Sequence, residues 1–208
     1  MVWFLSLITA PTALALTEAQ ARAHSRIDPS VPGDDLAVKL AAAISACEGF
    51  TGRQLVTATW ELWLSSWYEQ AIYQPSSCGT SPGVIWLPKP PVASITSIKY
   101  LDGDGAEQTM NPADYVLVAG AGPLAQRAGL FPAYGAAWPT NRIQAASIKV
   151  KFVSGYGVDA SYVPAELTQG MLAWFAELYE RREEQTVGAV VTPNVVTARR
   201  LWWPFRAF

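Results

Sequence analysis

The stretch Ser94–Met110, SITSIKYLDGDGAEQTM, decides the fold class because it has the pattern of two strands joined by a tight turn. The segments 94–101 and 106–110 flank Asp102-Gly103-Asp104-Gly105, a sequence typical of β-hairpin turns. Alternation or short apolar runs predict further strands at residues 56–64, 84–87, 115–119 and 148–152. We therefore expect an antiparallel β block in the middle of the chain. A stretch rich in Gly, Ala and Pro covers roughly residues 119–141 of it, and no strand is predicted there.

Helical patterns lie on both sides of this block. Thr17-Glu18-Ala19-Gln20 has the form of a capping box, which predicts a short helix ending near Arg26. A second helix is expected from Asp34 to Gly52, with Leu36, Leu40, Ile44 and Cys47 on its apolar face.

Two more helices are predicted after the β block. Pro164 is a favourable first residue for a helix whose apolar face carries Leu167, Met171, Trp174, Phe175 and Leu178. A short last helix is expected over 194–203, before Pro204. The predicted fold is thus α+β, with N- and C-terminal helices packed as a small bundle and an inserted antiparallel β block. We expect a single subunit, 1–208, made of N-terminal helices (17–52), a β-rich insertion (54–158) and C-terminal helices with a tail (163–208).

The apolar N-terminus, MVWFLSLITAPTALAL, is predicted to be a buried strand or a packing arm. No positive charge precedes Arg22 and Pro11 interrupts the apolar run, so a secretory signal is disfavoured. The run is also too short to span a membrane.

The composition is poor in charge for a chain of this size. Of the 208 residues, 15% are charged and 12% aromatic, whereas about 25% charged is usual. This balance excludes an intrinsically disordered protein, and the net charge of −2 excludes a generic basic nucleic-acid binder. The deficit indicates surface that partner subunits cover.

Catalytic and metal-binding chemistry is poorly supplied. The chain has one histidine, His24, at the end of a predicted helix, and two cysteines, Cys47 and Cys78, which are more typical of free thiols than of a disulfide. These residues cannot complete a four-ligand zinc site. Asp102 and Asp104 could bind Ca²⁺, but a tight turn explains both. We predict that the protein is not an enzyme and has no cofactor or metal.

The C-terminal tail is chemically distinct from the rest. Residues 185–208 contain three arginines and no acid, so the tail carries +3 and the remainder 12 − 17 = −5. The tail also holds Trp202, Trp203, Phe205 and Phe208, and Arg and Trp are enriched at the energetic centres of interfaces. From the residues alone, a partner-binding tail and one that folds back into its own core remain equally open.

Several motifs in order resemble the head–tail connector (adaptor) proteins of long-tailed bacteriophages and of related gene transfer agents. These motifs are LTEAQARAHSRID (16–28), FTGRQLVTATWEL (50–62), LPKPPVASITSIKYLDGDGAEQTMNPADYVL (87–117), IKVKFVSGYG (148–157) and VPAELTQGMLAWFAELYERRE (163–183). The most specific features are Thr51-Gly52-Arg53 before a Trp-bearing strand and the hairpin. The chain departs from the family pattern in its longer loop around Cys78 and in its aromatic tail.

The resemblance implies a structural adaptor that forms a twelve-fold ring beneath the portal of the capsid, extends the DNA channel and carries the stopper or tail. The implied location is the virion neck, with assembly in the bacterial host cytoplasm. The implied partners are the portal, the stopper or tail-completion protein, further copies of the chain and passing DNA that is not read by sequence, but no membrane. Candidate portal-binding residues are Arg199, Arg200, Trp202, Trp203, Phe205, Arg206 and Phe208.

Candidate subunit-interface residues are Tyr73 and Trp86, in the charge-poor stretch 70–98, and Trp138. The alternative function is a carbohydrate- or receptor-binding module of a virion, suggested by nine tryptophans and a β block. A regular strand would place Trp60 and Trp63 on opposite faces, which disfavours a sugar-stacking platform.

Overall fold

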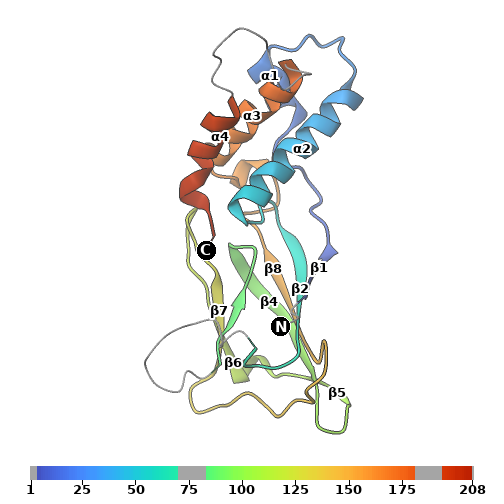
Figure 1. Cartoon of the computed structure of the whole chain (residues 1–208), viewed down its shortest axis with the longest axis vertical. Helices are drawn as coiled ribbons and strands as arrows, with labels where there is room; N and C mark the ends of the chain where they lie inside the picture. Colours follow the sequence, from blue (N-terminus) through green and yellow to red (C-terminus); the bar gives the residue numbers. More distant parts are fainter. Residues whose placement is uncertain (1–3, 70–82, 181–193, 208) are drawn as a thin grey trace. The chain divides into compact units, whose positions relative to one another are not determined.

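The computed structural model describes residues 4–69, 83–180 and 194–207 (Figure 1). Within these residues the chain forms four α-helices and two antiparallel sheets, so the prediction of a mixed α+β fold is confirmed. Contacts divide the described chain into two compact units. The sheet unit comprises residues 4–10 and 57–155, and the helical unit comprises residues 11–56 and 156–207.

The sheet unit contains a five-stranded and a three-stranded sheet. The larger has the order β1 (Phe4–Thr9), β2 (Ala58–Leu64), β8 (Ile148–Ser154), β4 (Val92–Leu101) and β5 (Glu107–Thr109). The smaller has the order β3 (Ile85–Leu87), β7 (Ala128–Pro132) and β6 (Tyr115–Val118).

The central strand β8 shows why the sequence folds this way. Ile148, Val150 and Phe152 are fully buried, whereas Lys149 and Lys151 alternate with them and form ion pairs with Glu107 and Glu61. This period of two places the apolar side chains in the core between the sheets and the charges on the outer face.

The predicted hairpin is formed by β4 and β5, which pair with Leu101 opposite Glu107. The Asp102 carboxylate accepts a hydrogen bond from the Gln108 side chain at 2.8 Å and others from the backbone N–H groups of Ala106 and Asp104. These bonds, that of Gln108 foremost, lower the pKa of Asp102. Gly105 has φ +89°, which only glycine adopts readily. The Asp102 carboxylate oxygens therefore serve as hydrogen-bond acceptors that stabilise the turn, which explains this residue without a metal ion.

Two strands differ from the sequence expectations. β1 is a strand, but it lies at the sheet edge and is mostly exposed, so the prediction of a buried strand is wrong. β7 lies inside the Gly-, Ala- and Pro-rich residues 119–141, where no strand was predicted. Ala128 and Leu130 of β7 are fully buried, and Gly129 fits beneath Phe131, whose ring would be 2.6 Å from an added Cβ. Small residues concealed this strand because they make the apolar pattern weak.

The helical unit contains α1 (Glu18–Ser25), α2 (Gly33–Thr51), α3 (Ala165–Glu180) and α4 (Asn194–Trp202), and 3₁₀ turns at Ala160–Tyr162 (η3) and Trp203–Phe205 (η4). All four predicted helices are present. Their common core is formed by buried apolar residues, among them Leu36, Leu40, Cys47, Leu167, Met171 and Phe175. No helix in the described part of the chain is long and apolar enough to cross a bilayer.

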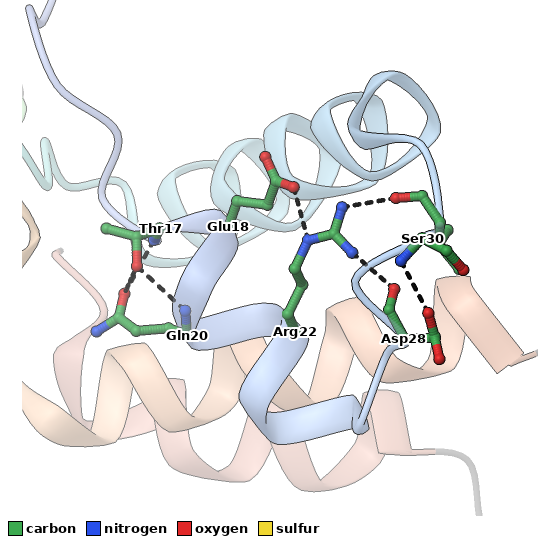
Figure 2. A network of polar contacts seen from close by, with 7 residues as sticks. Thr17, Glu18, Gln20, Arg22, Asp28 and Ser30 are labelled. Carbon is green, nitrogen blue, oxygen red and sulfur yellow. Dashed lines mark hydrogen bonds and ion pairs between the residues drawn. The ribbon is translucent and has the colours of Figure 1, made fainter.

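A polar network fixes the start of α1 and the turn that follows it (Figure 2). The predicted capping box is present, because Gln20 N–H donates to Thr17 Oγ1 and Thr17 N–H donates to Gln20 Oε1. Arg22 donates to Glu18 at 2.7 Å and to the carbonyl oxygens of Asp28 and Val31. The local sequence therefore specifies both the helix and its exit.

Candidate functional site

The C-terminal segment, α4 with η4, is anchored in the helical unit by Trp202. This side chain is fully buried, donates its indole N–H to the Leu167 carbonyl at 3.3 Å and stacks on Trp174 at 5.4 Å between ring centroids. Gly170 permits the close approach, since an added Cβ would lie 2.2 Å from the Trp202 indole nitrogen. Phe205 is also buried, at 5% exposure.

A second anchor is the Thr51-Gly52-Arg53 motif at the end of α2. Gly52 has φ +70° and turns the chain, and Thr51 accepts a 2.8 Å hydrogen bond from the Ala207 N–H. The buried guanidinium of Arg53 donates to the Phe205 carbonyl. The motif that is specific to the family in sequence therefore binds the backbone of the C-terminal segment, at Phe205 and Ala207.

Burial sets the protonation of the groups around this motif. Desolvation lowers the pKa of Arg53 and raises that of Tyr156, its side-chain hydrogen-bond partner, to about 12. Burial also raises the pKa of the Cys47 thiol, so this cysteine is a poor nucleophile and serves as a core residue.

The outer side of the same segment carries four residues that we call the arginine–tryptophan rim: Arg199, Arg200, Trp203 and Arg206. Trp203 is 59% exposed, and the Arg206 guanidinium lies 5.0 Å from its ring centroid and 5.6 Å from that of Phe50. Arg199 lies 5.9 Å from the Trp174 ring centroid. Neither Arg199 nor Arg200 forms an ion pair within the described residues. The rim thus combines exposed positive charge with aromatic area, a combination suited to an acidic or apolar protein surface.

The candidate portal-binding residues thus separate into two groups. Arg199, Arg200, Trp203 and Arg206 lie together on the rim. Trp202 and Phe205 are buried in the core of the subunit, so the proposed partner contact below is built on the four rim residues. Phe208 lies outside the described residues.

The candidate subunit-interface residues are not brought together as one surface. Trp138 is 7% exposed, donates to the Gly83 carbonyl at 2.6 Å and stacks on Trp67, so within the subunit it is a core residue of the sheet unit. Trp86 is half-buried on β3. Tyr73 lies outside the described residues.

Phe50 and Trp174, whose rings lie against the rim arginines, were not predicted from the sequence as part of the site. The available signal was Trp174 on the apolar face of a predicted helix, but which ring would meet an arginine depends on tertiary packing. His24 is exposed at the end of α1, as expected. In the described ranges no group of three His, Cys, Asp or Glu residues is placed to hold a metal ion. The Asp102–Asp104 turn and the rim offer no nucleophile with a base beside it.

No protein-family model and no curated protein sequence matches the chain. Solved structures do match it. A chain from the neck of an empty gene transfer agent particle, computed with C6 symmetry, is 28% identical with a TM-score of 0.74. A chain from the virion of the native particle has a TM-score of 0.72, and one from the native neck, computed with C12 symmetry, 0.68. Each alignment covers 99% of this chain and 96% of the other.

The alignment spans both units of the chain. The resemblance predicted from the sequence motifs is therefore confirmed, and the relatives are structural components, which agrees with the prediction of a non-enzymatic protein. Over nearly its whole length, this chain is similar in structure to neck proteins of gene transfer agent particles.

Proposed function

We propose that this protein is a head–tail adaptor: a structural neck component that forms a ring beneath the portal, extends the DNA channel and carries the stopper or tail. The observation that supports this most is the match over 99% of the chain to proteins of gene transfer agent particles, two of them from necks. Ring symmetry in those particles, C6 or C12, makes a twelve-fold ring the expected assembly here.

The arginine–tryptophan rim is the proposed portal contact. Its arginines belong to a tail with no acidic residue, and Trp203 presents a large apolar side chain in their midst. Because Trp202, Phe205 and Arg53 hold the segment from inside, the rim is preorganised and loses little conformational entropy on docking. We infer a portal surface with acidic and apolar residues opposite the rim.

The acidic remainder of the chain suits a conduit. With −5 on residues 1–184, the protein should not retain DNA, since a basic channel wall would grip the phosphates that must pass.

Deleting the tail would not test the rim cleanly, because residues 194–208 include the core side chains Trp202 and Phe205. The sharper test is the double reversal Arg199→Glu/Arg200→Glu, which changes two exposed residues. We expect particles made with this variant to lose the adaptor ring at least tenfold, as counted by electron microscopy, because charge-complementary docking becomes repulsive. The matched control, Arg127→Glu/Arg142→Glu, reverses two exposed arginines of the sheet unit and should assemble normally.

Wild-type particles whose neck lacks a ring of this chain would overturn the adaptor function. Equal loss of the ring in both double variants would overturn the rim as portal contact, since a general charge effect would then explain it. Circular dichroism of each purified variant, with a melting temperature close to that of the wild type, shows that the fold is intact.

A further inference from the structure

In the described chain the two sheets have four edge strands, and two of these are protected against pairing with another chain. β5 carries Glu107, whose carboxylate bridges Lys99 at 2.7 Å and Lys149 at 3.2 Å. β3 is three residues long, its Ile85 and Leu87 are fully buried, and prolines follow it. Charge, short length and proline are the usual means by which proteins block a sheet edge.

The other two edges, β1 and β6, lack such protection. Neither strand contains a charged residue or a proline. On β1, Leu7 and Ile8 are each 45% exposed, and on β6, Val116 and Val118 are 48% and 57% exposed. In the described residues β1 pairs with β2 alone and β6 with β7 alone, so each strand presents unpaired backbone N–H and C=O groups on its outer side.

We propose that neighbouring copies of this chain join edge to edge in the ring, with β1 of one copy pairing with β6 of the next. A ring needs two different surfaces on each copy, because a surface that pairs with itself closes a dimer and cannot continue. β1 and β6 supply such a pair, since they belong to different sheets of one unit. This inference rests on the proposed function, and C6 or C12 symmetry in the relatives' particles makes a second copy the occupant.

The length of the pairing explains when it forms. β6 has four residues, which span about 14 Å at 3.4 Å per residue. A stable interface buries about 800 Å² per partner, and so short a strand addition contributes only part of this. The pairing is therefore too weak to assemble rings in solution. It becomes effective when the portal holds the copies side by side, which raises their effective concentration.

The test places one lysine on each edge. We expect Leu7→Lys and Val116→Lys, each alone, to reduce complete neck rings at least tenfold in electron micrographs of purified particles, because pairing would bury an unpaired charge. The double variant Leu7→Lys/Val116→Glu should recover rings, because each lysine then meets a glutamate of the next copy. Thr109→Lys, on the exposed and already charged strand β5, is the matched control and should assemble normally.

Normal rings with either single lysine variant would overturn the edge pairing while leaving the adaptor function standing. So would a double variant that stays as defective as the single variants. A neck that lacks this chain in wild-type particles would instead overturn the adaptor function itself. If Leu7→Lys lowers the melting temperature of the purified subunit by more than a few degrees, Phe4→Lys on the same strand, at a residue that is 51% exposed, replaces it.

Discussion

Each unit of the molecule contains a stacked pair of tryptophans, and the two pairs differ in what surrounds them. In the sheet unit, Trp67 and Trp138 stack at 4.8 Å with an interplanar angle of 3°, and both indole N–H groups donate to backbone carbonyls. In the helical unit, Trp174 and Trp202 stack at 5.4 Å and 25°, but Trp174 is only half-buried and Arg199 lies over it.

Because the two pairs differ in burial, the number of tryptophans alone does not locate a binding surface. The sheet pair is closed, since Trp67 and Trp138 are 2% and 7% exposed. In the helical unit, solvent exposure of the tryptophans rises step by step. Trp202 is fully buried, Trp174 is half-buried, and Trp203, beneath Arg206, is 59% exposed. The arginines lie over the more exposed tryptophans, because a guanidinium can cover an aromatic ring and remain solvated. This arrangement supports the proposed portal contact.

The largest expected loss of stability comes from replacing one tryptophan of either pair by alanine. Trp67→Ala and Trp202→Ala should each lower the free energy of unfolding by about 3–5 kcal/mol, because each leaves a cavity. Trp67→Ala also removes the donor to the Pro139 carbonyl. Urea denaturation of the purified chain measures both. Trp203→Ala is the matched control: its side chain is exposed, so the loss should stay below about 1 kcal/mol, the scale of its contact with Arg206. Similar losses for Trp202→Ala and Trp203→Ala would contradict this difference in exposure.

The sequence was sufficient for the elements with strong local signals. The capping box at Thr17 and the alternation in Ile148–Phe152 predicted α1 and β8, because these patterns depend on residues close in the chain. β7 was missed because Gly129 and Ala128 pack through small size, which is visible only against Phe131.

The candidate site was predictable in composition but not in orientation. Arg199, Arg200 and the aromatic residues of the tail were identified from their types alone. Whether Trp202 or Trp203 faced inward depended on Leu167 and Gly170 of α3, which lie more than thirty residues away in the chain. Local periodicity does not carry that information.

A second prediction tests the close packing of Trp202 against α3 at Gly170. Gly170→Ala places a methyl group against the Trp202 indole, and overpacking costs about 1–3 kcal/mol, more than the gain of about 1 kcal/mol from helix propensity. We expect a net loss of up to about 2 kcal/mol in the free energy of unfolding. Gly49→Ala on α2 has no atom within 4 Å of the added Cβ, so the propensity gain alone should stabilise the chain. If Gly170→Ala stabilised the chain as Gly49→Ala does, the close contact would be refuted.

The last prediction concerns hydrogen bonding, where the units also differ. The sheet pair bonds to backbone carbonyls, which do not titrate, whereas the last turn of the helical unit is held by Arg53, the side-chain partner of Tyr156. Burial raises the pKa of Tyr156 from 10.0 to about 12, so the unfolded chain releases this proton first as the pH rises. Stability from this group is complete below pH 10 and is lost between pH 10 and about pH 12.

Thermal melts across that window should show a shallower decline of the melting temperature with pH for Tyr156→Phe than for the wild type. Tyr134→Phe, with a fully exposed ring, should keep the wild-type slope. A Tyr156→Phe slope equal to the wild type would mean that the hydroxyl is solvated in the folded chain, and that Arg53 holds the C-terminal turn without it.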